Sequence, residues 1–232
     1  LHDALPIFLL SAYEHAAHTD SLTPSQKEHL QTKFASGTEL GNGPARLAAM
    51  NLILNGMGKA NGPSPIEVRD SLTADPGARY SVILANPPFG TKSSNTFVGA
   101  DGKASKGDLE IVRDDFWVTT SNKQLNFVQH IKTIMKIEGR AAVVLPDNVL
   151  FEGGAGEIVR QRLLREFELH TILRLPTGIF YAGGVKANVL FFDKKPAGDR
   201  PWTNETWVYD FRTNMHFTQK TKSLKRADLE EF

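Results

Sequence analysis

The sequence predicts an α/β protein whose largely parallel β-sheet is covered by helices on both faces. The first observation is that segments with helical periodicity alternate along the chain with short apolar runs typical of strands. The second is that the run 140–145 is apolar almost throughout, as in strands buried on both faces of a sheet. With 232 residues, 41% of them hydrophobic and 23% charged, the chain is long enough for one sizeable α/β core.

Four segments are expected to form helices because their apolar residues recur at intervals of three or four positions. These helices cover residues 8–18, 44–55, 124–137 and 157–167. The residues expected on their inner faces are Leu47, Met50 and Leu54 in the second helix, Leu125, Val128, Ile131 and Met135 in the third, and Val159, Leu163 and Phe167 in the fourth. A further helix is expected to begin within residues 223–232.

Seven short apolar runs are expected to form strands. They lie within residues 33–40, where the strand ends at Glu39, and at 65–68, 80–85, 140–145, 170–175, 187–193 and 206–211. The strands at 170–175 and 187–193, joined by residues 176–186, are expected to pair as an antiparallel hairpin at the edge of the sheet.

Residues 91–108 are rich in Gly, Ser, Asn and Lys and show no apolar periodicity, which predicts a long loop. Its place directly after the strand 80–85 makes it a candidate lid or DNA-contacting loop, with Lys92, Lys103 and Lys106 available to phosphates. An insert without a role is the alternative interpretation.

The composition excludes several kinds of chemistry. The chain contains no cysteine, so it cannot use a thiolate nucleophile, cysteine zinc ligands or disulfides. A net charge of +1 does not by itself indicate a nucleic-acid partner, and the basic group formed by Lys220, Lys222, Lys225 and Arg226 is most simply a solvated face. No apolar run is long enough to span a membrane and no leader is evident, so the cytoplasm is the expected compartment.

The most informative motif is Asn86-Pro87-Pro88-Phe89, which ends the predicted strand 80–85. Two prolines prevent a helix from starting, so the Asn86 amide, the Pro87 carbonyl and the Phe89 ring are held at one rigid corner. Such a corner suits a planar exocyclic amine, because two acceptors can take its N–H hydrogens while the aromatic ring stacks on it. The motif therefore predicts a methyl-transfer site, with Pro88 fixing the backbone. A proline-stopped strand with a core Phe is the alternative.

With its neighbouring motifs, this corner resembles the N6-adenine DNA methyltransferases and, within them, the methylation (M) subunit of type I restriction-modification systems. The resemblance runs from about residue 8 to about residue 195. It is carried by TEL (38–40), LAAMNLILNG (47–56), DSL (70–72), NPPF (86–89), TSNKQLNF (120–127), GRAAVVLP (139–146) and LPTGIF (175–180).

The resemblance implies a Rossmann-like class I methyltransferase fold. It implies transfer of a methyl group from S-adenosyl-L-methionine to N6 of adenine in duplex DNA after base flipping, with no metal required. The partners that it implies are duplex DNA and the specificity and restriction subunits of a type I complex. Residues 8–195 are then expected to form the catalytic domain and residues 196–232 the start of a C-terminal extension.

The resemblance also assigns residues to the cofactor and the base. Glu39 is expected to accept hydrogen bonds from the ribose hydroxyls, although an acid at a strand end can also cap the next helix. Asp70 and Ser71 are expected at the cofactor's adenine, although Asp-Ser is also an ordinary turn pair, and Asn86 is expected to border the cofactor as well. Phe180, together with Tyr181, is expected to close the second face of the flipped base, with core packing as the equal alternative.

One part of the family pattern is missing from the sequence. Class I methyltransferases carry a glycine-rich turn after their first strand, where the backbone approaches the methionine part of the cofactor. Here residues 1–7 contain neither that strand nor its glycines, so they are interpreted as a non-native or divergent segment. We therefore expect the chain alone to be inactive.

Two other functions remain open. A protein glutamine methyltransferase uses a similar corner on an amide nitrogen, but such enzymes usually have Tyr at the position of Phe89. A non-catalytic DNA-binding or assembly subunit is the second alternative, suggested by the missing glycine turn.

Overall fold

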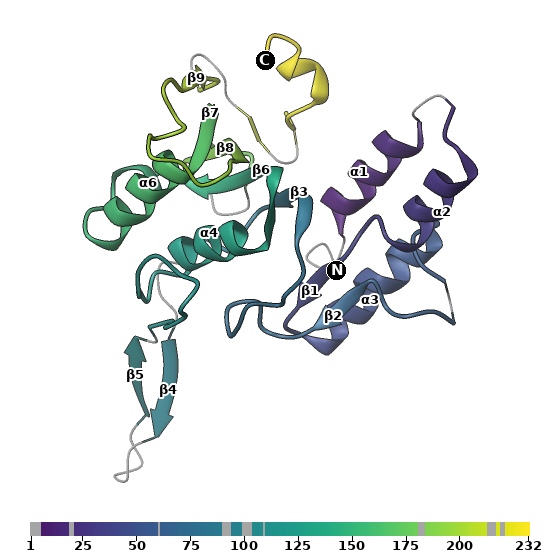
Figure 1. Cartoon of the computed structure of the whole chain (residues 1–232), viewed down its shortest axis with the longest axis horizontal. Coiled ribbons are helices and arrows are strands. Elements are labelled where there is room, and N and C mark those ends of the chain that lie inside the picture. The colour runs from purple at the N-terminus through teal and green to yellow at the C-terminus, as the bar shows by residue number, and fades with distance from the viewer. Residues whose placement is uncertain are drawn as a thin grey trace. The chain divides into compact units, whose positions relative to one another are not determined.

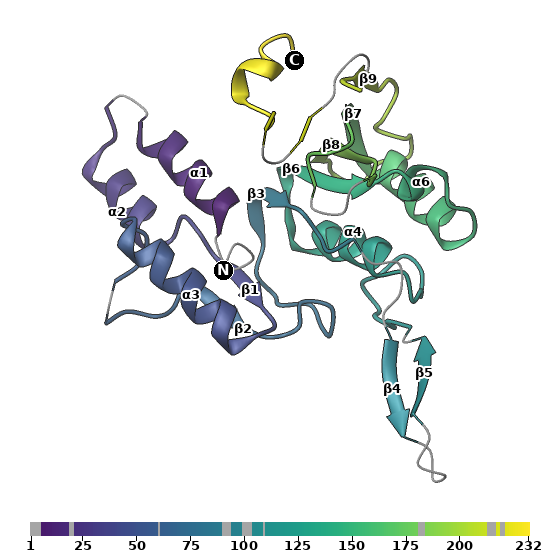
Figure 2. The same cartoon turned by 180° about the vertical axis from the view of Figure 1, so that it is seen from behind.

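The computed structural model of the protein describes residues 6–18, 21–59, 61–89, 94–98, 104–108, 110–180, 184–212, 217–218 and 221–232. The chain divides into two compact units, Leu1–Thr73 and Ala74–Phe232. Their elements are labelled in Figures 1 and 2.

The first unit contains three helices and a two-stranded sheet among its described residues. Its elements are α1 (Ile7–Ala17), α2 (Pro24–Thr32), β1 (Gly37–Glu39), α3 (Asn42–Leu54) and β2 (Ile66–Val68). The two strands are parallel, and Glu39 is paired with Val68 at their carboxyl ends. Both strands were expected, and β1 ends at the predicted residue.

Helix α2 was not expected from the sequence. It begins at a capping box, in which the Thr23 hydroxyl accepts from the Gln26 backbone N–H and the Gln26 side chain accepts from the Thr23 backbone N–H. Pro24 stands at its first position, where a proline is well tolerated. Only Leu30 is buried, so the helix has almost no apolar periodicity to reveal it.

The predicted inner face of α3 is wrong. The side chains of Ala45, Ala48 and Leu52 are buried and pack with Met57 and Ile66. By contrast, the predicted face is exposed: Leu47 by 45%, Met50 by 53% and Leu54 by 83%. The helix has apolar residues on two faces. The face with the small Ala45 and Ala48 side chains can approach the rest of the unit more closely than the face with Leu47, Met50 and Leu54.

The second unit is built on a five-stranded sheet in the order β3-β6-β8-β7-β9. Its described elements are β3 (Tyr80–Ala85), β4 (Ser94–Val98), β5 (Ala104–Asp108), α4 (Lys123–Ile134), β6 (Met135–Pro146), α5 (Asn148–Phe151), α6 (Ala155–Glu166), β7 (Phe167–Leu175), β8 (Ala187–Lys194), β9 (Trp207–Asp210) and a 3-10 turn (Arg226–Leu229). The pairs β3–β6 and β7–β9 are parallel, whereas β8 is antiparallel to both of its neighbours.

The sheet is thus mixed, and three local expectations need correction. The antiparallel hairpin is present as β7 and β8, but it is not at the edge because β9 pairs with the outer side of β7. The helix expected within 223–232 is only the 3-10 turn Arg226–Leu229. Met135 and Phe167, expected inside helices, are the first residues of β6 and β7, although both are buried as predicted.

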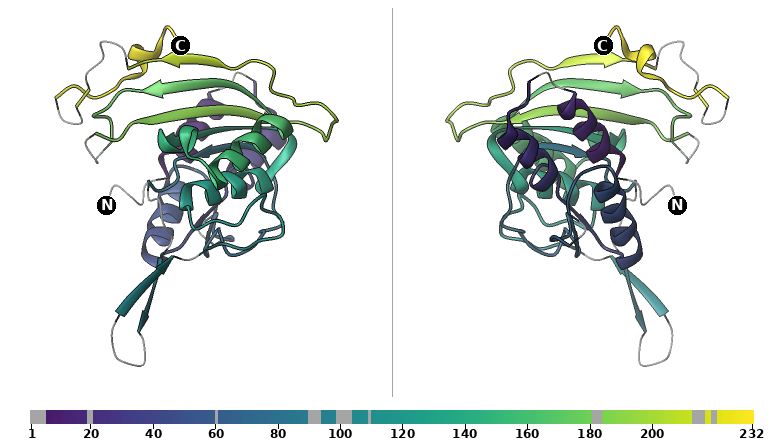
Figure 3. Two further views of the ribbon diagram at one scale, coloured as in Figure 1. Left: turned by 90° about the vertical axis from the view of Figure 1, so that its left-hand side faces the viewer. Right: turned by 90° about the vertical axis from the view of Figure 1, so that its right-hand side faces the viewer.

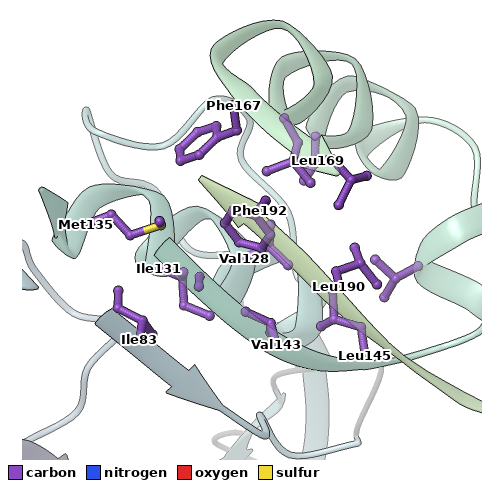
Figure 4. Packing of buried hydrophobic residues seen from close by; sticks show 14 of the residues in the cluster. Ile83, Val128, Ile131, Met135, Val143, Leu145, Phe167, Leu169, Leu190 and Phe192 are labelled. Atoms are coloured by element: carbon purple, nitrogen blue, oxygen red, sulfur yellow. The ribbon is translucent and has the colours of Figure 1, made fainter. Parts of the chain in front are cut away.

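The core of the second unit lies on both faces of the sheet. On one face, α4 and α6 cover the sheet (Figure 3). The buried strand residues Ile83, Val143 and Leu190 belong to the same cluster as Val128 and Ile131 of α4 (Figure 4). On the other face, Leu173 and Leu175 pack with Phe211 and Phe217 from the C-terminal segment. The predicted inner faces of α4 and α6 are confirmed.

The predicted loop 91–108 is wrong for ten of its residues. Strands β4 and β5 form an antiparallel hairpin whose register runs from the Ser94–Asp108 pair to the Val98–Ala104 pair. Polar strands that pair only with each other carry no apolar alternation, so the sequence pattern could not reveal them. Lys106 lies in β5, whereas Lys92 and Lys103 lie outside the described residues.

Candidate active site

The Asn86–Phe89 corner leaves the sheet at the carboxyl end of β3. The last pair of β3 with β6 joins Ala85 to Val143, and the chain then turns away through the two prolines. Pro87 is buried, Phe89 is half-buried and Asn86 is exposed. The corner is therefore anchored by its buried Pro87, and Asn86 is accessible from solvent, as a site for an incoming amine would require.

The structure brings Phe89 and Phe180 together. Their ring centroids lie 5.1 Å apart, and the ring planes are inclined at 74°, so the edge of one ring meets the face of the other. Strands β6 and β7 both run antiparallel to β8 and so run in the same direction as β3. Phe89 and Phe180 follow the carboxyl ends of β3 and β7, which explains why they meet at one edge of the sheet.

The contact between these rings also limits the site. Two rings in edge-to-face contact leave no room for a base between them, so one ring must turn or shift before a base can stack on Phe89. Tyr181, the other aromatic residue expected at the base, lies outside the described residues.

The sequence did not predict the polar groups at this edge of the sheet. Asp147 directly follows β6, Arg174 lies near the end of β7 and Asn188 near the start of β8. The signal that could have revealed them is a polar residue inside or directly after an apolar strand. Nearby, hydrogen bonds from Arg212 lower the pKa of Asp210 from 3.8 to about 2.

The residues expected at the cofactor lie in the first unit, at the carboxyl ends of β1 and β2. A carboxylate oxygen of Glu39 accepts from the Gly41 backbone N–H at 3.0 Å, directly before α3. A carboxylate oxygen of Asp70 accepts from the Leu72 backbone N–H at 2.9 Å. The Ser71 and Thr38 hydroxyls are hydrogen-bonded to each other. Glu39 thus makes the helix-capping contact, and Asp70 the turn contact, that the alternative interpretations predicted. Each of these contacts uses one oxygen of the carboxylate.

Cavities elsewhere do not coincide with the predicted site. A cavity of about 390 Å³ lies at the other end of the strands, where β7 begins and β8 ends. It is lined by Phe167, Lys194 and Trp202 among others. It contains none of the residues expected at the cofactor or the base. Within the described part of the chain, no three His, Asp or Glu side chains are grouped so that they could hold a metal ion, and no helix has the length and apolar character needed to cross a membrane.

Comparison with known proteins gives consistent matches. A family model described as N-6 DNA methylase matches residues 7–232. The methylase subunit of the type I restriction enzyme EcoKI, from Escherichia coli K12, is 45% identical over 203 residues, which are 84% of this chain and 36% of that protein. The corresponding StySJI subunit from Salmonella typhimurium is 42% identical over 203 residues, with the same coverage of 84% and 36%.

A solved structure agrees with these sequence matches. The crystal structure of the EcoKI M protein superposes with a TM-score of 0.79 at 39% identity, over 96% of this chain and 45% of that one. The chain therefore spans less than half the length of the relatives that it matches.

Proposed function

Because the chain belongs to the N-6 DNA methylase family, we propose that it carries catalytic residues of an adenine-specific DNA methyltransferase, the methylase subunit of a type I restriction-modification system. Its fold is of the Rossmann-like methyltransferase class. The observation that carries the proposal is the proline-rich corner after β3, in which Asn86 is exposed and the Phe89 ring contacts that of Phe180.

In this proposal the residues of the corner bind the adenine amine and make its nitrogen nucleophilic. The Asn86 side-chain oxygen and the Pro87 carbonyl accept the two N–H hydrogens of the adenine amine, which draws the nitrogen lone pair out of the ring and makes it nucleophilic. Pro88 holds the backbone so that both acceptors keep their spacing. Phe89 stacks on the flipped base, and Phe180 covers its second face once the two rings have separated.

The donor set of the first unit fits the adenosine end of S-adenosyl-L-methionine. Glu39 and Asp70 each keep one carboxylate oxygen beyond the oxygen that bonds the local backbone, so Glu39 would accept from the ribose hydroxyls and Asp70 from the adenine amine, with Ser71 beside the ring. When bound, this cofactor would supply an electrophilic methyl group on its sulfonium.

The partners of the complete protein are part of the same proposal. Its relatives are named as methylase subunits of type I restriction enzymes, so we infer that this protein assembles with specificity and restriction subunits on duplex DNA. In such a system the recognition sequence would be read by the specificity subunit.

The test is methyl incorporation into duplex DNA by the full-length protein and its Asn86→Ala variant, with titration of the cofactor in parallel. We expect Asn86→Ala to abolish methylation while cofactor affinity stays within about threefold, because the amide acts on the target amine.

Three outcomes would contradict the assignment. Turnover of Asn86→Ala at the wild-type level would remove Asn86 from the site. Methylation of glutamine in a protein by the wild type, with none of DNA, would favour the glutamine methyltransferase. Binding of DNA without any transfer would favour a non-catalytic subunit.

A further inference from the structure

Asp147 lies at the same edge of the sheet as the Asn86–Phe89 corner. In the parallel pair β3–β6, Ala85 is matched with Val143, so Phe89 and Asp147 each stand four residues beyond the last pair. Asp147 is also adjacent to the hairpin of β7 and β8, because Pro146 is paired with Ala187. The residue is therefore placed between the corner and the two strands that flank Phe180.

Asp147, Asn188 and Arg174 form a ring of polar contacts, and Oδ2 of Asp147 also lies 3.9 Å from Nη1 of Arg212. The Asn188 amide donates to Oδ1 of Asp147 at 2.7 Å, and Nε of Arg174 donates to Oδ1 of Asn188 at 3.3 Å. The ring closes through Nη2 of Arg174, which lies 3.5 Å from Oδ2 of Asp147. Each of the strands β7 and β8 contributes one residue, and Asp147 joins both to the end of β6.

Little water reaches this ring. Asn188 is fully buried, and the Arg174 and Asp147 side chains are only 21% and 23% exposed. Hydrogen bonds to charged groups are strong in such surroundings, and removal of one partner leaves the others unsatisfied. The ring therefore links the ends of β6 and β7 to the start of β8 while the carboxylate is present.

A backbone contact extends the connection to the chain that follows Phe180. The Asp147 N–H donates to the Lys186 carbonyl at 2.9 Å. Asp147 thus contacts the segments on both sides of Phe180. Arg174 belongs to β7, which precedes Phe180, and Lys186 and Asn188 follow Phe180 in the chain. It does not itself reach the Phe89 or Phe180 ring in any contact of the described residues.

We propose that Asp147 is a positioning residue of the methyl-transfer site, which sets Phe180 against Phe89 and so determines how well a flipped adenine is held. This inference rests on the proposed function. Asp147 acts through Arg174 and Asn188 and makes no contact with the reacting atoms.

The experiment compares Asp147→Ala and Asp147→Asn with the full-length wild type on duplex DNA. Fluorescence of 2-aminopurine at the target position reports base capture, while kcat, KM for DNA, the cofactor dissociation constant and Tm are measured on the same samples. We expect Asp147→Ala to reduce base capture and kcat by about tenfold to a hundredfold, the range for loss of a charged hydrogen bond, with cofactor affinity within about threefold of wild type.

The exchange variant Asp147→Asn/Asn188→Asp separates positioning from folding. It keeps one carboxylate and one amide in the ring and leaves that carboxylate facing Arg174. We expect Asp147→Asn alone to lose base capture, because its amide would turn a donor toward the guanidinium, and the exchange to restore part of it.

Asp193→Ala is the matched control. Asp193 is an ion-paired carboxylate at the opposite end of β8, 4.0 Å from Nζ of Lys195 and 34% exposed. Its removal should leave base capture and kcat unchanged.

The positioning role would be overturned if Asp147→Ala kept the base capture and the kcat of the wild type. This holds whether or not the Tm of the variant falls. If Asp193→Ala lost base capture equally, the effect would be general destabilisation and the proposal would also fail. Wild-type methylation of DNA separates these results from failure of the proposed function, because a wild type without transfer would overturn both.

Discussion

In the proposed site, Phe89 would have two roles that compete for the same ring. Its contact with Phe180 at 5.1 Å is a favourable edge-to-face pair, worth about 0.5–1.5 kcal/mol beyond the buried area. A flipped base must replace that contact before it can use the ring face. Base stacking on an aromatic side chain contributes about 1–3 kcal/mol, so stacking offsets the cost of separating the rings over most of these two ranges.

At this scale we predict that Phe89→Ala weakens base capture by about 1–3 kcal/mol, whereas Phe89→Tyr and Phe89→Trp retain much of the activity because the ring face stacks. Fluorescence of 2-aminopurine at the target position measures the effect. Trp207→Ala is the control, since Trp207 is an exposed aromatic residue that begins β9 at the other edge of the sheet. Equal base capture by Phe89→Ala would place Phe89 in the core instead.

The turn after β7 depends on a glycine and on the C-terminal segment. Gly178 has a φ of +90°, and a Cβ added there would lie 2.1 Å from the Phe217 carbonyl oxygen. Phe217 is buried and its ring lies 5.8 Å from that of Phe211. The turn that leads to Phe180 is therefore packed directly against the C-terminal segment.

Gly178→Ala should lower the free energy of unfolding by about 1–3 kcal/mol from backbone strain, with a further loss from the clash with Phe217. Gly184→Ala is the matched control, because Gly184 has the same φ of +90° but no atom of the described residues lies within 4 Å of its Cβ position. Urea unfolding of both variants of the full-length protein gives the difference due to packing. Equal losses would show that Phe217 does not restrict the turn.

Each unit of the molecule contains a sheet with an unpaired edge. Among the described residues, β3 has a strand on one side only, and its outward side chains Val82 and Leu84 are 57% and 40% exposed. The sheet formed by β1 and β2 has two strands, which is marginal for independent stability. Unpaired edges with exposed apolar residues favour aggregation.

For the molecule as a whole we predict that the 232-residue chain expressed alone is poorly soluble or partly unfolded and transfers no methyl group. Expression of the full-length protein should restore cofactor binding. Solubility, melting and calorimetric titration with S-adenosyl-L-methionine measure this. A soluble chain that melts cooperatively and binds the cofactor tightly would contradict the prediction.

The sequence by itself determined the fold class, the strand ends at Glu39 and Ala85, the corner at Asn86 and the buried faces of α4 and α6. Those features depend on local periodicity and on proline, whose effects reach only a few residues along the chain.

Only the tertiary structure decided which apolar face of α3 is buried, that β9 pairs with the outer side of β7, and that the Phe89 ring contacts the Phe180 ring. It also decided that Asp147, Arg174 and Asn188 form one ring. The reason is that strand pairing and the choice between two possible faces depend on contacts between residues far apart in the chain, which no local pattern encodes.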